Sequence, residues 1–179
     1  MSSPAVMLSA ALDDVPAILA LRDELARWMV GNSIMQWVPG EYPAGRLAAE
    51  VGSGEWYALW SESGDLRAAV RLVWSDAEFW GEDTPAGYIH GLMVAPAARG
   101  TGLGSAVLRF CGERTLAHGL TTQRLDVVAS NPVLRDYYAR HGFAEVREVP
   151  LPAHFGTRNR VVLLERALVP DGTRALSSE

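Results

Sequence analysis

The chain has 179 residues, of which 49% are hydrophobic and 21% charged, a composition that suits the core of one ordinary domain and argues against wholesale disorder. A net charge of −5 argues against a general binder of nucleic-acid phosphates, and the absence of lysine excludes Schiff-base chemistry and a lysine phosphate loop. A single cysteine, Cys111, excludes an internal disulfide and a multi-cysteine metal site, so we expect no metal. The N-terminus lacks the basic region of a secretory signal and no apolar run suits a membrane span, so we expect a soluble cytoplasmic protein.

The first elements are one strand and two helices. Residues Ala5–Leu12 predict a strand. An aspartate at position 13 or 14 then caps a helix that has a proline in its first turn and apolar residues at helical spacing to about Val30. After a loop-like segment, Pro43–Val51 predicts a short second helix.

Three strand patterns follow, and they predict an antiparallel meander over Glu55–Trp60, Leu66–Trp74 and Ala86–Val94. The second and third strands are joined by an acidic stretch. Its carboxylates are those of Asp76, Glu78, Glu82 and Asp83.

The second half of the chain alternates helices and strands. Thr101–His118 predicts a helix, Arg124–Ala129 an apolar strand, and Pro132–His141 a further helix. Two more strands are expected over Phe143–Val149 and Val161–Leu168. The strand–helix–strand crossover at the centre should be parallel and right-handed.

This order predicts one mixed α/β domain over residues 5–168, with about seven strands, about four helices and a loose tail over residues 169–179. No internal repeat or linker indicates a second domain. Cys111 and four tryptophans that fall on periodic elements are expected in the core. These tryptophans are Trp28, Trp56, Trp60 and Trp74.

The most informative segment is the glycine-rich connection Val94–Ser105, which lies between a predicted strand and a predicted helix. Free backbone N–H groups and the helix dipole favour an anion at such a position. The dinucleotide fingerprint fails in register, because the third glycine expected after Gly100 and Gly102 is Ser105. The pattern that remains is Arg99-x-x-Gly102-x-Gly104.

This pattern resembles motif A of the GNAT superfamily of N-acetyltransferases, R/Q-x-x-G-x-G/A. A second segment, Asn131–Phe143, resembles the family's N-x-x-A-x-x-x-Y-x-x-x-G-F. It departs from that motif at Leu134, where alanine is common, and at Tyr137, where leucine is usual. The two motifs cover about residues 88–143, and the order of elements extends the resemblance to residues 5–168.

The resemblance implies a GNAT-like fold, in which a mostly antiparallel sheet holds a parallel, splayed pair at strands four and five, and acetyl-CoA binds in the splay. The pantetheine arm would be held by backbone groups of Leu92, Met93 and Val94, with Asn131 reaching it as well as capping a helix. A main-chain N–H near Met93 would polarise the thioester carbonyl. The pyrophosphate would be cradled by the amides of the loop. These belong to Arg99, Gly100, Thr101, Gly102, Leu103, Gly104 and Ser105.

Amine acetylation needs a neutral amine and a proton for the departing thiolate. Tyr138 suits the second task, because a phenol with a pKa near ~10 can donate to a thiolate with a pKa of ~8.5 if it is positioned. His90 is a candidate base, and strand alternation predicts that it shares a face with Tyr88, Leu92 and Val94. Glu82 and Asp83 are rival bases, and water alone is the remaining option.

Two loops are expected to line the acceptor site by the same resemblance. Trp37 and Tyr42 lie between the first two helices, whereas His154, Phe155 and Arg158 lie between the last two strands.

The sequence therefore predicts direct transfer of an acetyl group from acetyl-CoA to a primary amine in a ternary complex. The acceptor stays open between a small-molecule amine and a protein N-terminus, with no nucleic acid or membrane partner and a homodimer left open. One alternative is a non-catalytic acyl-CoA-binding or sensing module. The other is a nucleotide-binding domain that uses the loop for ATP or NAD, against which the failed glycine register and the absent lysine argue.

Overall fold

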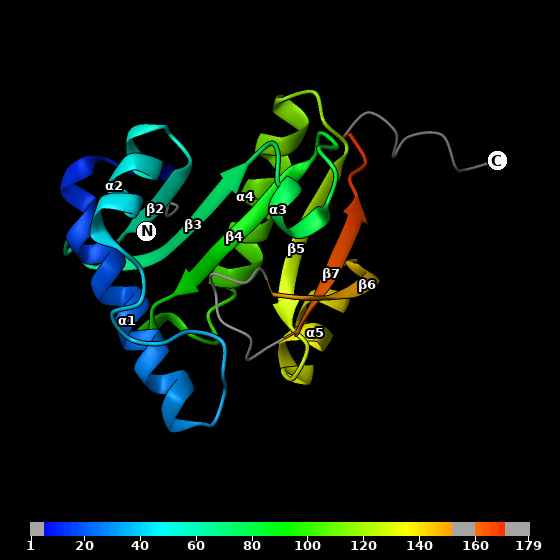
Figure 1. Ribbon diagram of the computed structural model, residues 1–179. Helices are drawn as coiled ribbons and strands as arrows, with labels where there is room; N and C mark the ends of the chain where they lie inside the picture. Colours follow the sequence, from blue (N-terminus) through cyan, green and yellow to red (C-terminus); the bar gives the residue numbers. More distant parts are fainter. Residues whose placement is uncertain (1–5, 152–159, 171–179) are drawn as a thin grey trace.

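The computed structural model describes residues 6–151 and 160–170, and within them it shows one seven-stranded sheet in the order β1-β2-β3-β4-β5-β7-β6 (Figure 1). The strands are β1 (Leu8–Ser9), β2 (Trp56–Trp60), β3 (Leu66–Val73), β4 (Gly87–Val94), β5 (Thr122–Val128), β6 (Ala144–Pro150) and β7 (Arg160–Ala167). The helices are α1 (Val15–Gly31), α2 (Ala44–Gly52), α3 (Ala77–Trp80), α4 (Leu103–Ala117) and α5 (Pro132–Ala139). All neighbouring strands are antiparallel except β4 and β5, which confirms the predicted fold class.

Two short segments differ from the prediction. The first strand is only Leu8–Ser9, because the chain turns into a 3₁₀ segment at Leu12–Asp14, where the Ala11 N–H donates to Asp14 Oδ2 at 2.8 Å. The sequence also missed α3, a single turn inside the acidic stretch. Asp76 caps this turn by accepting from the Phe79 N–H at 3.4 Å.

The sheet has helices on both faces (Figure 1). On one face α4 packs over β3, β4 and β5, and the core there includes Leu72, Ile89, Val107 and Leu125. On the other face α1 and α2 bury a second cluster around Ile18. A third cluster under α3 contains Trp80 and Tyr88. No helix in the described residues is long and apolar enough to span a membrane.

The predicted core residues are confirmed with one exception. Cys111 and Trp56 are buried, and Trp60 and Trp74 are partly buried against the two main clusters. Trp28 is 45% exposed, so the prediction of a core position is wrong for this residue. It lies near the end of α1, where its ring contacts a guanidinium instead of the sheet.

The parallel pair β4 and β5 separates part of the way along its length. The two strands pair only from Gly87 with Gln123 to Ile89 with Leu125, although β4 continues to Val94. Immediately past the last pair, β4 has a bulge at Gly91, where φ is +54° and the register with β3 shifts. The sheet therefore opens into a gap with one free edge of β4 along it.

Candidate active site

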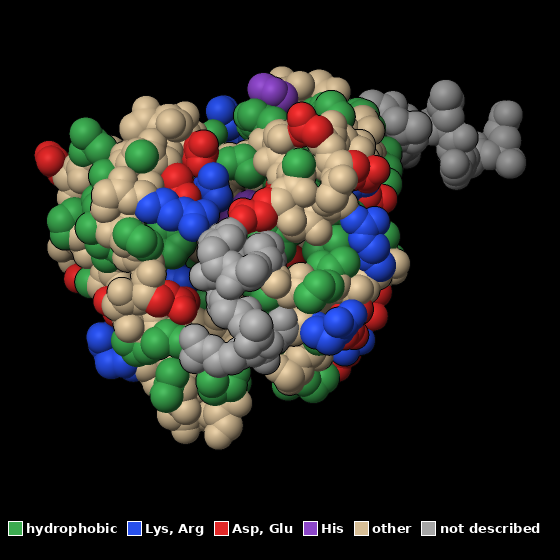
Figure 2. Space-filling view, in the orientation of Figure 1, with side chains coloured by type: hydrophobic (Ala, Val, Ile, Leu, Met, Phe, Trp, Pro, Cys, Tyr) green, Lys and Arg blue, Asp and Glu red, His purple; other side chains and the backbone are tan. Residues whose placement is uncertain are grey.

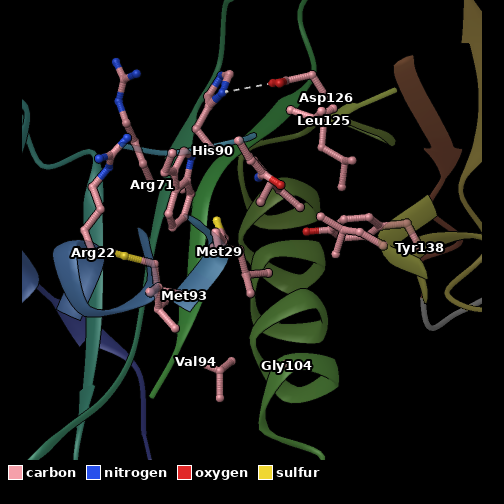
Figure 3. Close-up of a pocket in the computed structure, with 18 of the residues that line it drawn as sticks. Arg22, Met29, Arg71, His90, Met93, Val94, Gly104, Leu125, Asp126 and Tyr138 are labelled. Atoms are coloured by element: carbon pink, nitrogen blue, oxygen red, sulfur yellow. Dashed lines mark ion pairs between the residues drawn. The ribbon is translucent and has the colours of Figure 1, made fainter. Parts of the chain in front are cut away.

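A cavity of about 620 Å³ lies at this gap and reaches both faces of the sheet. Its walls come from the α1–α2 loop, the α3 segment, the splayed parts of β4 and β5, the first turn of α4, and α5 (Figure 3). On the outer face, basic and acidic side chains lie side by side between the α1–α2 layer and α3 (Figure 2). One cavity therefore joins the glycine loop to the candidate catalytic residues.

The glycine loop forms the N-terminal end of α4. Gly100 and Gly102 have φ of +74° and +80°, and Gly102 is the residue before the first turn. A Cβ added at either position would meet no protein atom within 4 Å, so backbone conformation and not crowding requires glycine there. The space left open lies at a helix N-terminus, where main-chain N–H groups and the helix dipole favour a phosphate.

The other predicted loop residues divide into two groups. Arg99, Leu103, Gly104 and Ser105 line the cavity together with the two glycines. The Arg99 guanidinium lies over the Trp28 ring at 4.3 Å. Thr101 is not among the residues that line the cavity in the described part of the chain, and its hydroxyl donates to the Ala98 carbonyl at 2.6 Å.

Gly104 is required for a different reason, which is the approach of Tyr137 from α5. A Cβ at Gly104 would lie 2.5 Å from the Tyr137 hydroxyl oxygen. The motif allows glycine or alanine at this position, and this chain has tyrosine where leucine is usual in the second motif. Glycine at position 104 therefore leaves the space that the tyrosine at position 137 occupies.

This contact predicts that the effect of Gly104→Ala changes sign with the residue at position 137. In the parent chain the overlap should lower the free energy of unfolding by ~1–3 kcal/mol. In a Tyr137→Leu background the same change should be neutral or stabilising, because alanine favours a helix by up to ~1 kcal/mol over glycine. Urea unfolding of the four proteins measures the coupling. Equal effects of Gly104→Ala in both backgrounds would contradict the contact.

The bulge in β4 overturns the predicted alternation around His90. Ile89, Leu92 and Val94 all pack in the cluster on the α4 face, whereas Tyr88 packs under α3. His90 is on the Tyr88 side, and the extra residue at Gly91 then reverses the faces of the residues that follow. His90 therefore faces away from Leu92 and Val94, toward the α1–α2 side of the cavity.

His90 lies between two carboxylates. Its Nε2 is 3.1 Å from Asp76 Oδ2. Its Nδ1 is 3.6 Å from Asp126 Oδ1, and a dashed line marks this pair in Figure 3. Burial alone opposes a charge on the ring, but the interactions of the ring with the two carboxylates outweigh it and raise the pKa of His90 to about 9. His90 is therefore an imidazolium at neutral pH in the protein without bound substrate.

The sequence missed both partners of His90 and named other carboxylates as rival bases. Glu82 lies 3.4 Å from the Arg124 guanidinium, and Asp83 accepts from the Ser75 hydroxyl. Neither is among the described residues that line the cavity. The sequence did contain one sign of Asp126, because it is an acidic residue among the apolar residues at the end of β5.

Tyr138 enters the cavity from α5 on the opposite side of the sheet (Figure 3). It is buried, and this burial, together with the nearby Tyr137, Asp126 and Cys111, raises the pKa of the Tyr138 hydroxyl above its usual value. None of the described residues forms a hydrogen bond with that hydroxyl, which leaves it available for a ligand. Asn131 caps α5 by accepting from the Leu134 N–H at 3.1 Å, and its contact with pantetheine stays a prediction.

The α1–α2 loop forms the outer wall. Trp37 and Tyr42 both line the cavity, and they enclose the Arg22 guanidinium at 4.8 and 4.7 Å. Glu50 holds this wall together by accepting from Tyr42, Trp56 and Arg46. The corresponding distances are 2.7, 2.8 and 2.9 Å. The other predicted acceptor loop, with His154, Phe155 and Arg158, lies outside the described residues.

A splayed parallel pair beside a glycine-capped helix, with a cavity through the sheet, is the architecture of an acyl-CoA-dependent acetyltransferase. The Acetyltransferase (GNAT) family model matches residues 20–143, which is more than half of the chain. The chain therefore belongs to the GNAT family of acetyltransferases, whose acyl donor is acetyl-CoA.

Solved structures of this family share the fold. One is a GNAT family acetyltransferase from Listeria monocytogenes 4b F2365, with 24% identity and a TM-score of 0.74 over 94% of this chain and 100% of that one. Another is the PaiA N-acetyltransferase from Thermoplasma acidophilum in complex with coenzyme A, with 16% identity and a TM-score of 0.68 over 92% and 99% of the two chains. A third is the ribosomal-protein-alanine N-acetyltransferase from Brucella melitensis, with 18% identity and a TM-score of 0.67 over 91% and 99%. No curated protein matches the chain.

Proposed function

We propose that the protein transfers the acetyl group of acetyl-CoA directly to a primary amine that enters from the α1–α2 side. One observation carries this proposal: a single cavity joins the glycine loop and Tyr138 on one side of the sheet to His90 on the other. The donor and the acceptor can therefore meet at the gap between β4 and β5. The predicted cytoplasmic location and the choice between a small-molecule amine and a protein N-terminus stay predictions.

The residues present fit acetyl-CoA. The open side of Gly100 and Gly102 at the start of α4 suits the pyrophosphate. The free edge of β4 at Leu92, Met93 and Val94 suits pantetheine, which can bind there as an added strand does. When bound, acetyl-CoA supplies an activated acetyl thioester.

The side chains at the gap have separate roles in this proposal. His90 takes the proton of the acceptor amine, which attacks only when it is neutral. Tyr138 donates a hydrogen bond to the departing sulfur and keeps its own proton. The two groups approach from opposite faces, so the amine is deprotonated on one side of the gap and the departing sulfur is stabilised on the other.

The experiment that tests the proposed function is a screen of amines with detection of the CoA thiol released. Turnover with any primary amine supports the proposed acetyl transfer. Tight binding of acetyl-CoA without turnover over the whole panel would favour the non-catalytic module. Thermal shifts with CoA, ATP and NAD separate both from a nucleotide-binding domain, since the acetyltransferase and the acyl-CoA-binding module each predict a preference for CoA.

The raised pKa of His90 predicts the pH dependence of the reaction. The base must be neutral, so kcat/KM should rise with pH through an ionisation at about 9, and this ionisation should be absent in His90→Gln. An acceptor of low basicity keeps the ionisation of the amine out of the profile. An identical profile in a folded His90→Gln variant would mean that another group, or water, takes the proton of the acceptor amine.

Folding stability offers a second readout of the same group. The pKa of His90 is about 9 in the folded protein, and an unfolded histidine has a pKa of about 6.5. The stabilisation from the charged ring is therefore complete below about pH 6.5 and is lost as the pH rises through about 9. The difference in unfolding free energy between the parent and His90→Gln should shrink over that window. A difference that does not change with pH would contradict the raised pKa.

A further inference from the structure

The floor of the acceptor side is a row of side chains that crosses four neighbouring strands. Trp56 on β2 pairs in register with Arg71 on β3, and Arg71 pairs with His90 on β4. Asp126 on β5 follows the last residue that pairs with β4 and lies 3.6 Å from His90. An acceptor that enters from the α1–α2 side, as proposed above, would pass over this row to reach the gap, and the charges of the row would then act on it.

Three arginines line the acceptor side of the cavity, and each forms an ion pair with a glutamate. Arg22 pairs with Glu41 at 2.9 Å, Arg46 with Glu50 at 2.9 Å, and Arg71 with Glu55 at 2.7 Å. The Arg71 pair uses two guanidinium nitrogens on one carboxylate oxygen. This end of the cavity therefore has no net charge to attract the carboxylate of an acceptor.

The His90 end has surplus negative charge. The side chain of Asp76 is only 8% exposed, and among the described residues no N–H or O–H donates a well-aligned hydrogen bond to its Oδ2. No arginine in the described part of the chain forms an ion pair with Asp76 or Asp126. Two carboxylates thus share one imidazole, and the other charged groups that line the cavity nearby are Glu78 on α3 and Arg71 on β3.

We propose, on the basis of the proposed function, that Asp76, His90 and Asp126 form an ammonium subsite, and that the acceptor is an aliphatic primary amine that arrives as a cation without a carboxylate. The ammonium takes the place of the imidazolium as the cation beside Asp126. His90 then releases its ring proton to solvent. Docking of the substrate in this way converts His90 from a charged partner of the carboxylates into a neutral base.

The proton balance needs three transfers. The imidazolium N–H bond of His90 breaks first, and water takes that proton as the ammonium docks. An ammonium N–H bond then breaks, its proton passes to the vacated ring nitrogen, and the electron pair stays on the amine nitrogen that attacks. Once the C–N bond has formed, the nitrogen holds one proton more than the amide, and this proton passes to the departing sulfur as the C–S bond breaks. The surplus charge at the two carboxylates explains why a second cation is attracted to a site that already holds one.

Calorimetry with the CoA-saturated protein tests the subsite without requiring turnover. The probes are pentylamine, 1,5-diaminopentane and 5-aminopentanoate, which share a chain length and differ in the charge at the far end. Titrations at pH 8 in two buffers of different ionisation enthalpy count protons. We expect the two carboxylate-free amines to bind with release of up to one proton. We expect 5-aminopentanoate to bind about tenfold or more weakly, because no net positive charge compensates for the desolvation of its carboxylate.

Two variants make the test specific. Asp126→Asn should raise the dissociation constant of pentylamine about tenfold or more, since it removes one carboxylate of a desolvated pair. His90→Gln should retain amine binding and abolish proton release. Glu82→Gln is the matched control, because Glu82 comes from the same acidic stretch as Asp76 but lies outside the cavity.

The outcomes separate this inference from the proposed function. Amine binding without proton release, unchanged affinity in Asp126→Asn, or equal binding of 5-aminopentanoate would overturn the subsite even if the enzyme acetylates amines. Proton-coupled binding of pentylamine with no thiol release from acetyl-CoA for any amine of the panel would support the subsite and overturn the acetyltransferase.

Discussion

Replacing Tyr138 with phenylalanine is expected to lower kcat by about 10²-fold while leaving the affinity for acetyl-CoA unchanged. The hydroxyl lines the cavity, and none of the described residues forms a hydrogen bond with it. Its loss should therefore remove a contact with the departing sulfur and little else. The ring packs against Tyr137 and Phe143, and phenylalanine preserves both contacts.

The raised pKa of Tyr138 sets the size of this effect. General acids typically contribute ~10²–10⁴-fold, with the most from an acid whose pKa lies near the operating pH. Burial makes the Tyr138 phenol a weaker acid than usual, and this widens the gap to a thiol of pKa ~8.5. Complete proton transfer to sulfur is thus uphill, and the hydroxyl acts mainly by hydrogen bonding to the developing thiolate. We therefore expect the loss in kcat to lie near the lower end of this range, at about 10²-fold.

Steady-state kinetics on an amine from the screen, with single-turnover measurements to isolate the chemical step, checks this expectation. Tyr57→Phe is the matched control. Tyr57 is buried in the same core cluster, but its hydroxyl accepts from Arg114 and does not line the cavity. A kcat of Tyr138→Phe within about threefold of the parent would leave under ~1 kcal/mol to the hydroxyl and would remove it from the mechanism.

The features that the sequence predicted well are those that local residue patterns encode. The glycine loop was found because Gly100 and Gly102 need positive φ, and a helix follows them at once. The order of the longer elements follows from apolar periodicity and from caps such as Asn131. The pairing of Gly104 with Tyr137 could not be seen in the sequence, where Gly104 conforms to the first motif and Tyr137 is a departure from the second, because α4 and α5 meet only through the fold.

The parts of the site that were missed depend on strand pairing and on one extra residue. The bulge at Gly91 leaves no mark on an alternation pattern, yet it reverses the faces of Leu92 and Val94 relative to His90. Asp126 and Asp76 reach His90 from a parallel neighbour strand and from the turn before α3. Such contacts join residues far apart in sequence, so the high pKa of His90 could not be predicted from its own strand.

The second large effect is expected at Gly102, where alanine should weaken CoA binding by about 10²-fold, or ~2.7 kcal/mol. Gly102 has a φ of +80° and lines the cavity, and a Cβ there would enter the open space at the start of α4 instead of a packed core. A methyl group in that space would hold a phosphate away from the main-chain N–H groups that bind it. Valine would add strain at this φ, so alanine is the cleaner probe.

Gly119 supplies the control for the cost of the backbone conformation itself. It follows α4 at the other end, with a φ of +79°, and a Cβ there also meets no protein atom within 4 Å. Both alanine variants should therefore lose a similar ~1–2 kcal/mol of stability, because an L-residue is strained in the left-handed region. Calorimetric titration with CoA should separate them: Gly119→Ala retains the parent affinity and Gly102→Ala does not. Equal CoA affinities in the two variants, at matched stability, would mean that the pyrophosphate binds elsewhere than at the N-terminus of α4.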